Sequence, residues 1–146
     1  MLRSIFPGIL ALMLALGSAA LANGHSHEAT LYKNPDCGCC DSYADYLRMN
    51  GFSVVVKPTD ELAQMNRLAG IPEGFEGCHL AMIDGYVISG HVPVNVVERL
   101  IAEQPEITGI TLPGMPSGSP GMSGPKSSPF EIYQIATGSP RIYAVD

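Results

Sequence analysis

Strand-like and helix-like spacings of apolar residues follow one another early in the chain. EATLYKN (28–34) is short, partly apolar and followed by proline, and FSVVVKP (52–58) is rich in β-branched residues, so both segments are predicted to be strands. Between them, CDSYADYLRMNG (40–51) has apolar residues at helical spacings and stops at an Asn-Gly pair, a signal for the end of a helix. The pattern predicts a strand, a helix and a second strand.

The same two spacings continue further along the chain. TDELAQMNRLAGIP (59–72) places apolar residues on one helical face and stops at a glycine. HLAMIDGYVISGH (79–91) is predicted to form two strands around Asp84-Gly85, the strongest two-residue hairpin signal in the chain. PVNVVERLIAEQ (93–104) is predicted to be a helix that begins at its proline. The resulting order, β-α-β-α-β-β-α, is that of the thioredoxin fold, so the predicted class is α/β and thioredoxin-like.

The composition changes after residue 107. The next segment, ending at Pro129, is rich in Gly, Pro and Ser and has no helical or alternating period, which predicts a loop over 108–129. FEIYQIATGSPRIYAVD (130–146) has two alternating segments around a TGSP turn, which predicts a short terminal hairpin packed on the domain. The thioredoxin-like domain is accordingly assigned to residues 23–107.

The first 22 residues have the features of a secretory signal peptide. Arg3 precedes an apolar run, and Ala20 and Ala22 frame an A-x-A cleavage site. An uncleaved membrane anchor is the alternative, which the Pro7-Gly8 break disfavours, and no second apolar run is long enough to span a bilayer. The expected location is the periplasm, with no membrane contact after cleavage. A net charge of −6 without a basic cluster argues against a nucleic-acid partner.

Four cysteines carry the candidate chemistry. NPDCGCCDSY places Cys37, Cys39 and Cys40 where the first helix should begin, and the N-terminus of a helix lowers the pKa of a nearby thiol. In an exported protein, the general expectation for four cysteines is two disulfides. Cys37 and Cys40 also form the C-x-x-C pair of thioredoxins, which indicates thiol-disulfide exchange.

Two details favour a metal over thiol exchange. Cys39, placed between the members of the pair, would compete in a dithiol reaction. Counting back from the hairpin puts His79 where thioredoxin-like proteins have a cis-proline that faces the C-x-x-C, with Cys78 just before it. A fourth thiol and an imidazole would then face the first three thiols.

The identity of the metal follows from the crowding of the thiols. Structural zinc usually takes its ligands from two separated pairs, whereas adjacent Cys39 and Cys40 would bind one tetrahedral ion with strain. Crowded thiolates can each bridge two soft ions, and Cu(I) is the soft ion that favours thiolates. Thioethers and imidazoles provide further candidate ligands: Met115, Met122, His25, His27, His79 and His91. For the two methionines, a solvent-facing linker is the alternative, while Met49, Met65 and Met82 fall on apolar faces and are expected in the core.

Three motifs, YKNPDCGCC, GCHLAMIDGYVISGHVP and ITLPGMPSGSPGM, resemble the exported copper-resistance proteins of the CopG type, which are small thioredoxin-like metal-binding proteins of Gram-negative bacteria. The resemblance implies a periplasmic protein that binds copper, in a cluster of more than one ion, and acts in copper resistance or copper redox handling beside other periplasmic copper-handling proteins. It also implies that Cys37, Cys39, Cys40 and Cys78 are the thiolate ligands. His79 and His91 match the GCH and GHVP positions of the family.

Two other functional classes stay open. One is a periplasmic thiol-disulfide oxidoreductase that uses Cys37 and Cys40, with Cys78 as a resolving thiol, and the other is a disulfide-stapled interaction module. Whether the protein is an enzyme is therefore not decided by the sequence. Separately, cleavage after Ala22 would expose Asn23-Gly24-His25, with His27 nearby, and a free amine followed by a third-position histidine can bind Cu(II) in a square plane.

Overall fold

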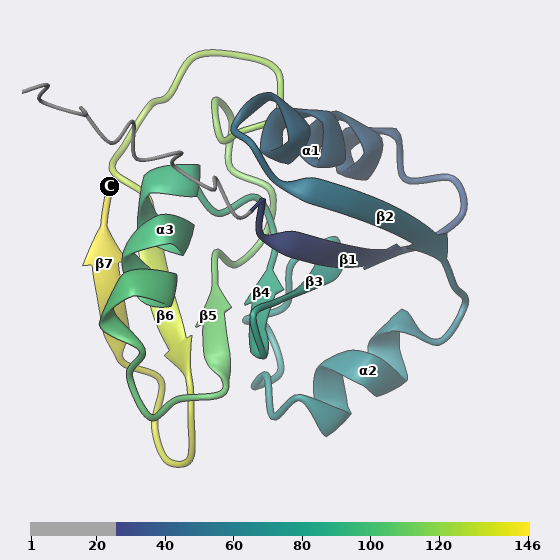
Figure 1. Cartoon of the computed structure of the whole chain (residues 1–146). Coiled ribbons are helices and arrows are strands. Elements are labelled where there is room, and N and C mark those ends of the chain that lie inside the picture. The colour runs from purple at the N-terminus through teal and green to yellow at the C-terminus, as the bar shows by residue number, and fades with distance from the viewer. Residues whose placement is uncertain (1–25) are drawn as a thin grey trace, which may run out of the picture.

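Seven strands and three helices make up residues 26–146, the part of the chain that the computed structural model describes (Figure 1). Their bounds are β1 Glu28–Lys33, α1 Gly38–Met49, β2 Ser53–Pro58, α2 Leu62–Leu68, β3 His79–Ile83, β4 Tyr86–Ser89, α3 Val94–Glu103, β5 Gly109–Thr111, β6 Glu131–Ile135 and β7 Ile142–Val145. Among these residues, no helix is long and apolar enough to cross a membrane. The predicted signal peptide and the Asn23-Gly24-His25 motif lie outside the described residues.

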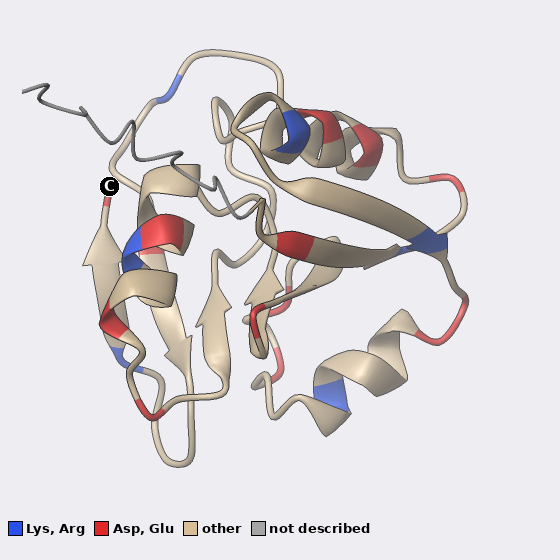
Figure 2. Cartoon of the chain, viewed as in Figure 1, with Lys and Arg blue, Asp and Glu red and all other residues tan. Residues whose placement is uncertain are grey.

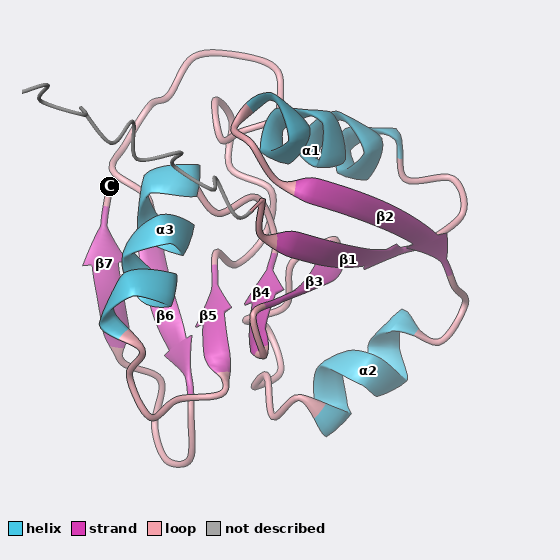
Figure 3. Cartoon of the chain, in the orientation of Figure 1, coloured by secondary structure: helices cyan, strands magenta, loops and turns pink. Residues whose placement is uncertain are grey.

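All seven strands belong to one mixed sheet, in the order β2-β1-β3-β4-β5-β6-β7 (Figure 3). β1 pairs in parallel with β2 and β4 with β5, and the other neighbours are antiparallel. This arrangement confirms the predicted α/β class.

The sheet buries apolar side chains on both faces. Alternate residues of a strand point to opposite faces, so Leu80 packs in the smaller core with Leu62 of α2, while Ala81 belongs to the larger core that includes residues of α1 and α3. Leu47 of α1 and Leu100 of α3 are fully buried in that larger core. α1 and α3 therefore share one core, while α2 packs in the other.

The register of β1 against β3 positions the cysteines. Lys33, the last residue of β1, pairs with His79, the first residue of β3. Because α1 follows β1 after a short loop, the residue before β3 lies beside the start of α1. Close backbone approach also requires glycine here, since a Cβ atom on Gly77 would lie 2.2 Å from the Cα of Gly90.

Charged side chains are spread over separate elements in the view of Figure 2, and the blue segments of Lys and Arg form no continuous patch there. Five ion pairs involve described residues, and four of them join side chains that are at least partly exposed on both sides. The remaining pair, Lys33 with Asp41, includes a buried lysine beside the cysteines.

Several local predictions are wrong. Residues Gly109–Thr111 form strand β5 and not a loop; three residues are too few to show an alternating pattern. Met49 and Met82 are 85% and 38% exposed and not in the core. The apolar face predicted for 59–72 is not buried throughout, since Leu68, the last residue of α2, is 79% exposed.

Candidate metal centre

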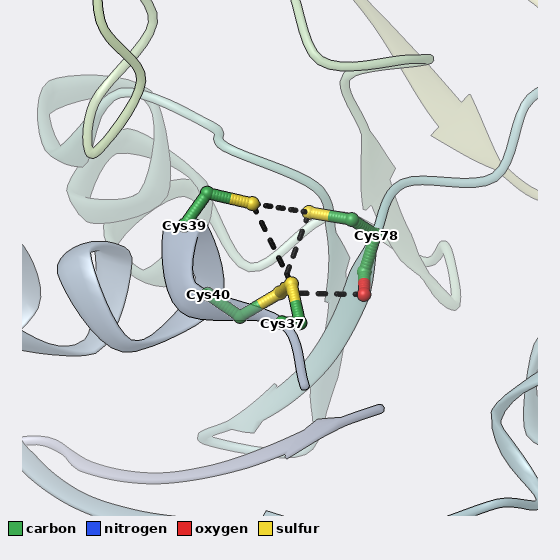
Figure 4. Close-up of side chains that lie close together, drawn as sticks. All are labelled: Cys37, Cys39, Cys40 and Cys78. Carbon is green, nitrogen blue, oxygen red and sulfur yellow. Dashed lines mark hydrogen bonds between the residues drawn. A yellow bond between two sulfur atoms is a disulfide. The ribbon is translucent and has the colours of Figure 1, made fainter. Parts of the chain in front are cut away.

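Four sulfur atoms meet where α1 begins and β3 begins (Figure 4). Cys37 is the N-cap residue of α1, Cys39 and Cys40 lie in its first turn, and Cys78 immediately precedes β3. The four Sγ atoms all lie within 4.8 Å of one another. Two segments that are far apart in the sequence thus contribute to one cluster.

The cluster contains one disulfide and two free thiols. Cys37 and Cys40 are joined by the disulfide, and Cys39 and Cys78 are free. Cys37 Sγ lies 3.5 Å from Cys39 Sγ, and Cys78 Sγ lies 3.5 Å from Cys40 Sγ and 3.9 Å from Cys39 Sγ. The structure therefore shows the C-x-x-C pair oxidised, in contact with both remaining thiols.

These separations suit a thiolate-bound metal once the disulfide is reduced. Two sulfurs bound to one trigonal ion at a metal–sulfur distance of about 2.3 Å lie about 4.0 Å apart. The observed contacts of Cys39 with Cys37 and Cys78 are 3.5 and 3.9 Å. Small shifts would bring these sulfurs to bonding positions around soft ions.

His91 faces Cys78 in a fixed orientation. Its Nδ1 lies 2.6 Å from the carbonyl oxygen of Pro120 and its Nε2 lies 2.9 Å from Cys78 Sγ. Because a carbonyl only accepts, Nδ1–H is the donor, and burial lowers the pKa of His91, so the neutral ring leaves Nε2 as an acceptor. The Cys78 S–H then donates to Nε2, an atom that is also available to a metal.

His79 is more deeply enclosed. Its Nδ1 lies 3.5 Å from Cys78 Sγ, its ring packs 4.5 Å from the ring of Tyr43, and its Nε2 has no hydrogen-bond partner among the described residues. Burial first, and then neighbouring His91, lower the pKa of His79 to about 3. Burial first, and then Cys39, raise the pKa of Cys78 to about 12. Near neutral pH the site therefore holds two neutral imidazoles and a protonated Cys78.

The Gly/Pro/Ser-rich loop packs against the cluster and does not project from the domain. Met115 Sδ lies 3.9 Å from Cys39 Sγ, although Met115 is 51% exposed. A Cβ on Gly121 would lie 2.8 Å from the backbone nitrogen of Tyr43 in α1, so this loop residue approaches the helix as closely as only glycine allows. No hydrogen bond or sulfur contact joins Met122 to the thiols within residues 26–146.

His27, one of the two predicted N-terminal ligands, is not brought to the cluster. His27 Nδ1 pairs with the carboxylate of Asp84 in the β3–β4 turn, and its ring lies 5.7 Å from that of Phe52. His25 is outside the described residues. His27 is thus already engaged with a carboxylate.

Two neighbours of the site were missed in the sequence. Pro120 belongs to a segment without any period, so no local signal could have linked it to His91. Lys33 did have a signal: Ala29, Leu31 and Lys33 alternate along β1 and all three are buried. A lysine at an inward position of a predicted strand indicates a role other than solubility.

Comparison with known proteins gives one family and two structures. Residues 75–122, which include Cys78, match the family described as "Protein of unknown function, DUF411". A solved structure of copper resistance protein CopG (Form 2) is 28% identical, has a TM-score of 0.76, and the match covers 83% of this chain and 98% of that chain. Its Form 1 structure is 28% identical with a TM-score of 0.74, over 82% and 96% of the two chains. No curated protein matches the chain.

Proposed function

The family match and the two CopG structures support a CopG-type copper-resistance family for this chain, and from this premise we propose that it is a periplasmic protein that holds Cu(I) through Cys37, Cys39, Cys40 and Cys78. One observation carries the proposal, namely that the four Sγ atoms lie within 4.8 Å of one another. Four soft sulfur donors in so small a volume suit Cu(I) better than harder ions. The proposed role is copper resistance or copper redox handling, on a thioredoxin-like arrangement of residues 28–103.

Copper binding by all four sulfurs requires reduction of the disulfide. The reductant added before copper supplies the two electrons and, with solvent, the two protons that convert the Cys37–Cys40 disulfide into two thiols, and each thiol then releases its proton when it binds the ion. Cys39, in contact with both Cys37 and Cys78, is placed to bridge two coppers. His91 Nε2 and Met115 Sδ, next to Cys78 and Cys39, are the proposed additional ligands.

The test is Cu(I) titration of the anaerobically reduced mature protein, with bound copper and free thiols counted per chain. We expect Cys78→Ser to lower the affinity for Cu(I) at least tenfold while the circular dichroism spectrum stays that of the wild type. The matched control is the double variant Cys78→Ser/Ser127→Cys, which keeps four thiols per chain but moves one to the exposed Ser127 position. If that control binds copper as the wild type does, the thiols act without a common site and the proposal fails.

The observed disulfide favours a second candidate function, thiol-disulfide exchange by Cys37 and Cys40. Free Cys78 lies 3.5 Å from Cys40 Sγ, close enough to act as a resolving thiol. Cys39→Ser separates the two functions, because a bridging ligand is lost while the C-x-x-C pair is retained. Full copper loading together with reduction of a disulfide substrate by Cys39→Ser would replace the copper proposal with this one.

Cleavage after Ala22 would also expose Asn23-Gly24-His25, which we propose as a separate Cu(II) site. N-terminal sequencing of the mature protein that starts at another residue removes this motif.

A further inference from the structure

Lys33 is a buried cation in contact with the backbone of the segment that carries the first three cysteines. Residues 26–146 contain seven lysines and arginines, and Lys33, 4% exposed, is the one among them that is buried. Lys33 is the last residue of β1 and its side chain points inward. Its ammonium group therefore lies under the loop that leads to α1. Burying a charge is costly unless it is paired and hydrogen-bonded.

The three N–H groups of the Lys33 ammonium match three acceptors. Nζ lies 3.1 Å from the carbonyl oxygen of Pro35, 3.1 Å from that of Cys37 and 2.9 Å from Asp41 Oδ2. Pro35 precedes the first cysteine and Asp41 follows the last cysteine of the C-x-C-C segment. One side chain therefore ties down both ends of the segment that carries three of the four thiols.

Lys33 holds the start of α1 through acceptors on either side of it, because its ammonium donates to the Cys37 carbonyl and to Asp41 in the first turn. Cys37, the N-cap residue, makes no side-chain capping hydrogen bond. The loop is closed by one backbone hydrogen bond, from Cys37 N–H to the oxygen of Asn34 at 3.1 Å. Loss of the Lys33 contacts would remove the ammonium donor from the Cys37 and Pro35 carbonyls.

We propose that Lys33 is a positioning residue that fixes the C-x-C-C segment and supplies the positive charge that offsets the thiolates in the copper-bound state. The charge part of this inference rests on the proposed function. Four thiolates carry four negative charges and each Cu(I) returns one, so a site with fewer than four coppers is anionic. A buried ammonium is poorly screened by solvent and salt, so it acts on that charge more strongly than an exposed lysine does.

Replacing both partners of a buried ion pair with apolar residues of similar volume is often neutral or stabilising, whereas removing one partner alone is destabilising. Methionine has nearly the length of lysine, so Lys33→Met removes the charge and the three contacts while keeping most of the volume. Asp41, the ionic partner, is largely exposed, with a side-chain exposure of 57% against 5% for Lys33. The buried end of the pair is thus the positive one, and it contacts the backbone carbonyl of Cys37.

The experiment compares Cu(I) affinities of reduced protein by competition with a chromophoric chelator. Lys33→Met should bind Cu(I) about tenfold more weakly, and Lys33→Arg, which keeps the charge, should recover most of that loss. Asp41→Asn should bind as tightly as the wild type or more tightly, because it leaves the ammonium and the two carbonyl contacts in place and removes a competing negative charge. Arg48→Met is the matched control, since it removes one positive charge at the other end of α1, where Arg48 pairs with Asp45.

Each outcome decides a part of the proposal. Wild-type affinity in Lys33→Met overturns it, and weakened binding in Asp41→Asn overturns the charge role while leaving a tethering role. If Lys33→Met does not fold, Lys33→Arg and Asp41→Asn still test the charge role. Positioning is tested without copper: hydrogen exchange of the Cys37 N–H in oxidised protein should be at least tenfold faster in Lys33→Met than in wild type and Lys33→Arg. Failure of every variant, wild type included, to bind copper would reject the proposed function and leave this exchange test valid.

Discussion

At the residue scale, two buried imidazoles approach the same sulfur and differ in what holds them. His91 is oriented by the Pro120 carbonyl, which fixes the tautomer and directs Nε2 toward Cys78. His79 Nε2 has no partner among the described residues, although the ring is fully buried against Tyr43. Outer groups of this kind commonly orient the ligands of a metal site. His91 is therefore the better candidate ligand. His79, whose buried Nε2 has no partner among the described residues, is expected to lower the stability of the fold.

That cost should depend on pH. Because the pKa of His79 falls to about 3 in the folded protein, while an unfolded histidine titrates near 6.5, only the unfolded chain binds this proton at intermediate pH. The folded copper-free protein must then lose stability as the pH falls from about 6.5 to about 3, by about 1 kcal/mol per pH unit. His79→Leu should remove this part of the acid dependence, measured by urea unfolding at pH 7, 6, 5 and 4.

Unfolding measurements at alkaline pH provide a control for the comparison of wild type with His79→Leu. Above about pH 7.5 both states carry a neutral His79, so the difference between wild type and His79→Leu should be constant there. Parallel curves over the whole acid range would show that His79 is not the group responsible.

At the element scale, the loop between β5 and β6 positions His91 through its contact with α1. Gly121 has a φ of +80° and lies against the backbone of Ser42 and Tyr43. The preceding residue, Pro120, accepts the hydrogen bond from His91. Ser119 is 1% exposed, so the segment behaves as part of the packed domain.

Gly121→Ala should displace this loop. The added Cβ would lie 2.8 Å from the Tyr43 nitrogen in a backbone conformation that already strains a non-glycine residue. We expect the unfolding free energy to drop by more than the about 1–3 kcal/mol that backbone strain alone costs, together with faster tryptic cleavage after Lys126 and weaker Cu(I) binding. The matched control is Gly138→Ala, where φ is +100° but nothing lies within 4 Å. Equal losses in the two variants would show that the contact with α1 is unimportant.

At the scale of the whole molecule, the candidate site joins segments that are distant in the sequence and that follow or precede strands of one sheet. Cys37 to Cys40 follow β1, Cys78 precedes β3, and Met115 follows β5. The terminal hairpin completes this side of the sheet: β6 pairs with β5, and Phe130 and Asp146 exchange backbone hydrogen bonds of 2.8 and 3.0 Å. A metal that binds these segments only in the folded state must stabilise the entire domain.

Copper should accordingly raise the melting temperature of the reduced protein. Free Cu(I) at 100 times its Kd contributes about 2.7 kcal/mol, which corresponds to roughly 10 °C for a domain of this size. Differential scanning calorimetry in buffered Cu(I) measures the shift. The same buffer should move the melting temperature of Cys78→Ser by much less, and an equal shift in that variant would place the bound copper elsewhere.

Local patterns in the sequence determined the α/β class and most of the elements up to residue 104. Alternation, the Asp84-Gly85 turn and helix-stop residues act over a few neighbours, so they could be read without a partner segment. They also predicted that Cys37, Cys39 and Cys40 lie at the start of a helix. Counting back from the hairpin predicted that Cys78 faces these three thiols. The three-residue strand β5 escaped because its pairing with β4, and not its own pattern, makes it a strand.

Tertiary structure alone decided which side chains surround the thiols. Met49 and Met82 are exposed because no element covers them, although their spacing resembles that of core residues. Pro120 reaches His91 across 29 positions, and Lys33 reaches Asp41 only because β1 ends beneath the first turn of α1. Contacts of this kind depend on the packing of elements that are distant in the sequence, and packing follows from shape and available space, which a one-dimensional pattern does not encode.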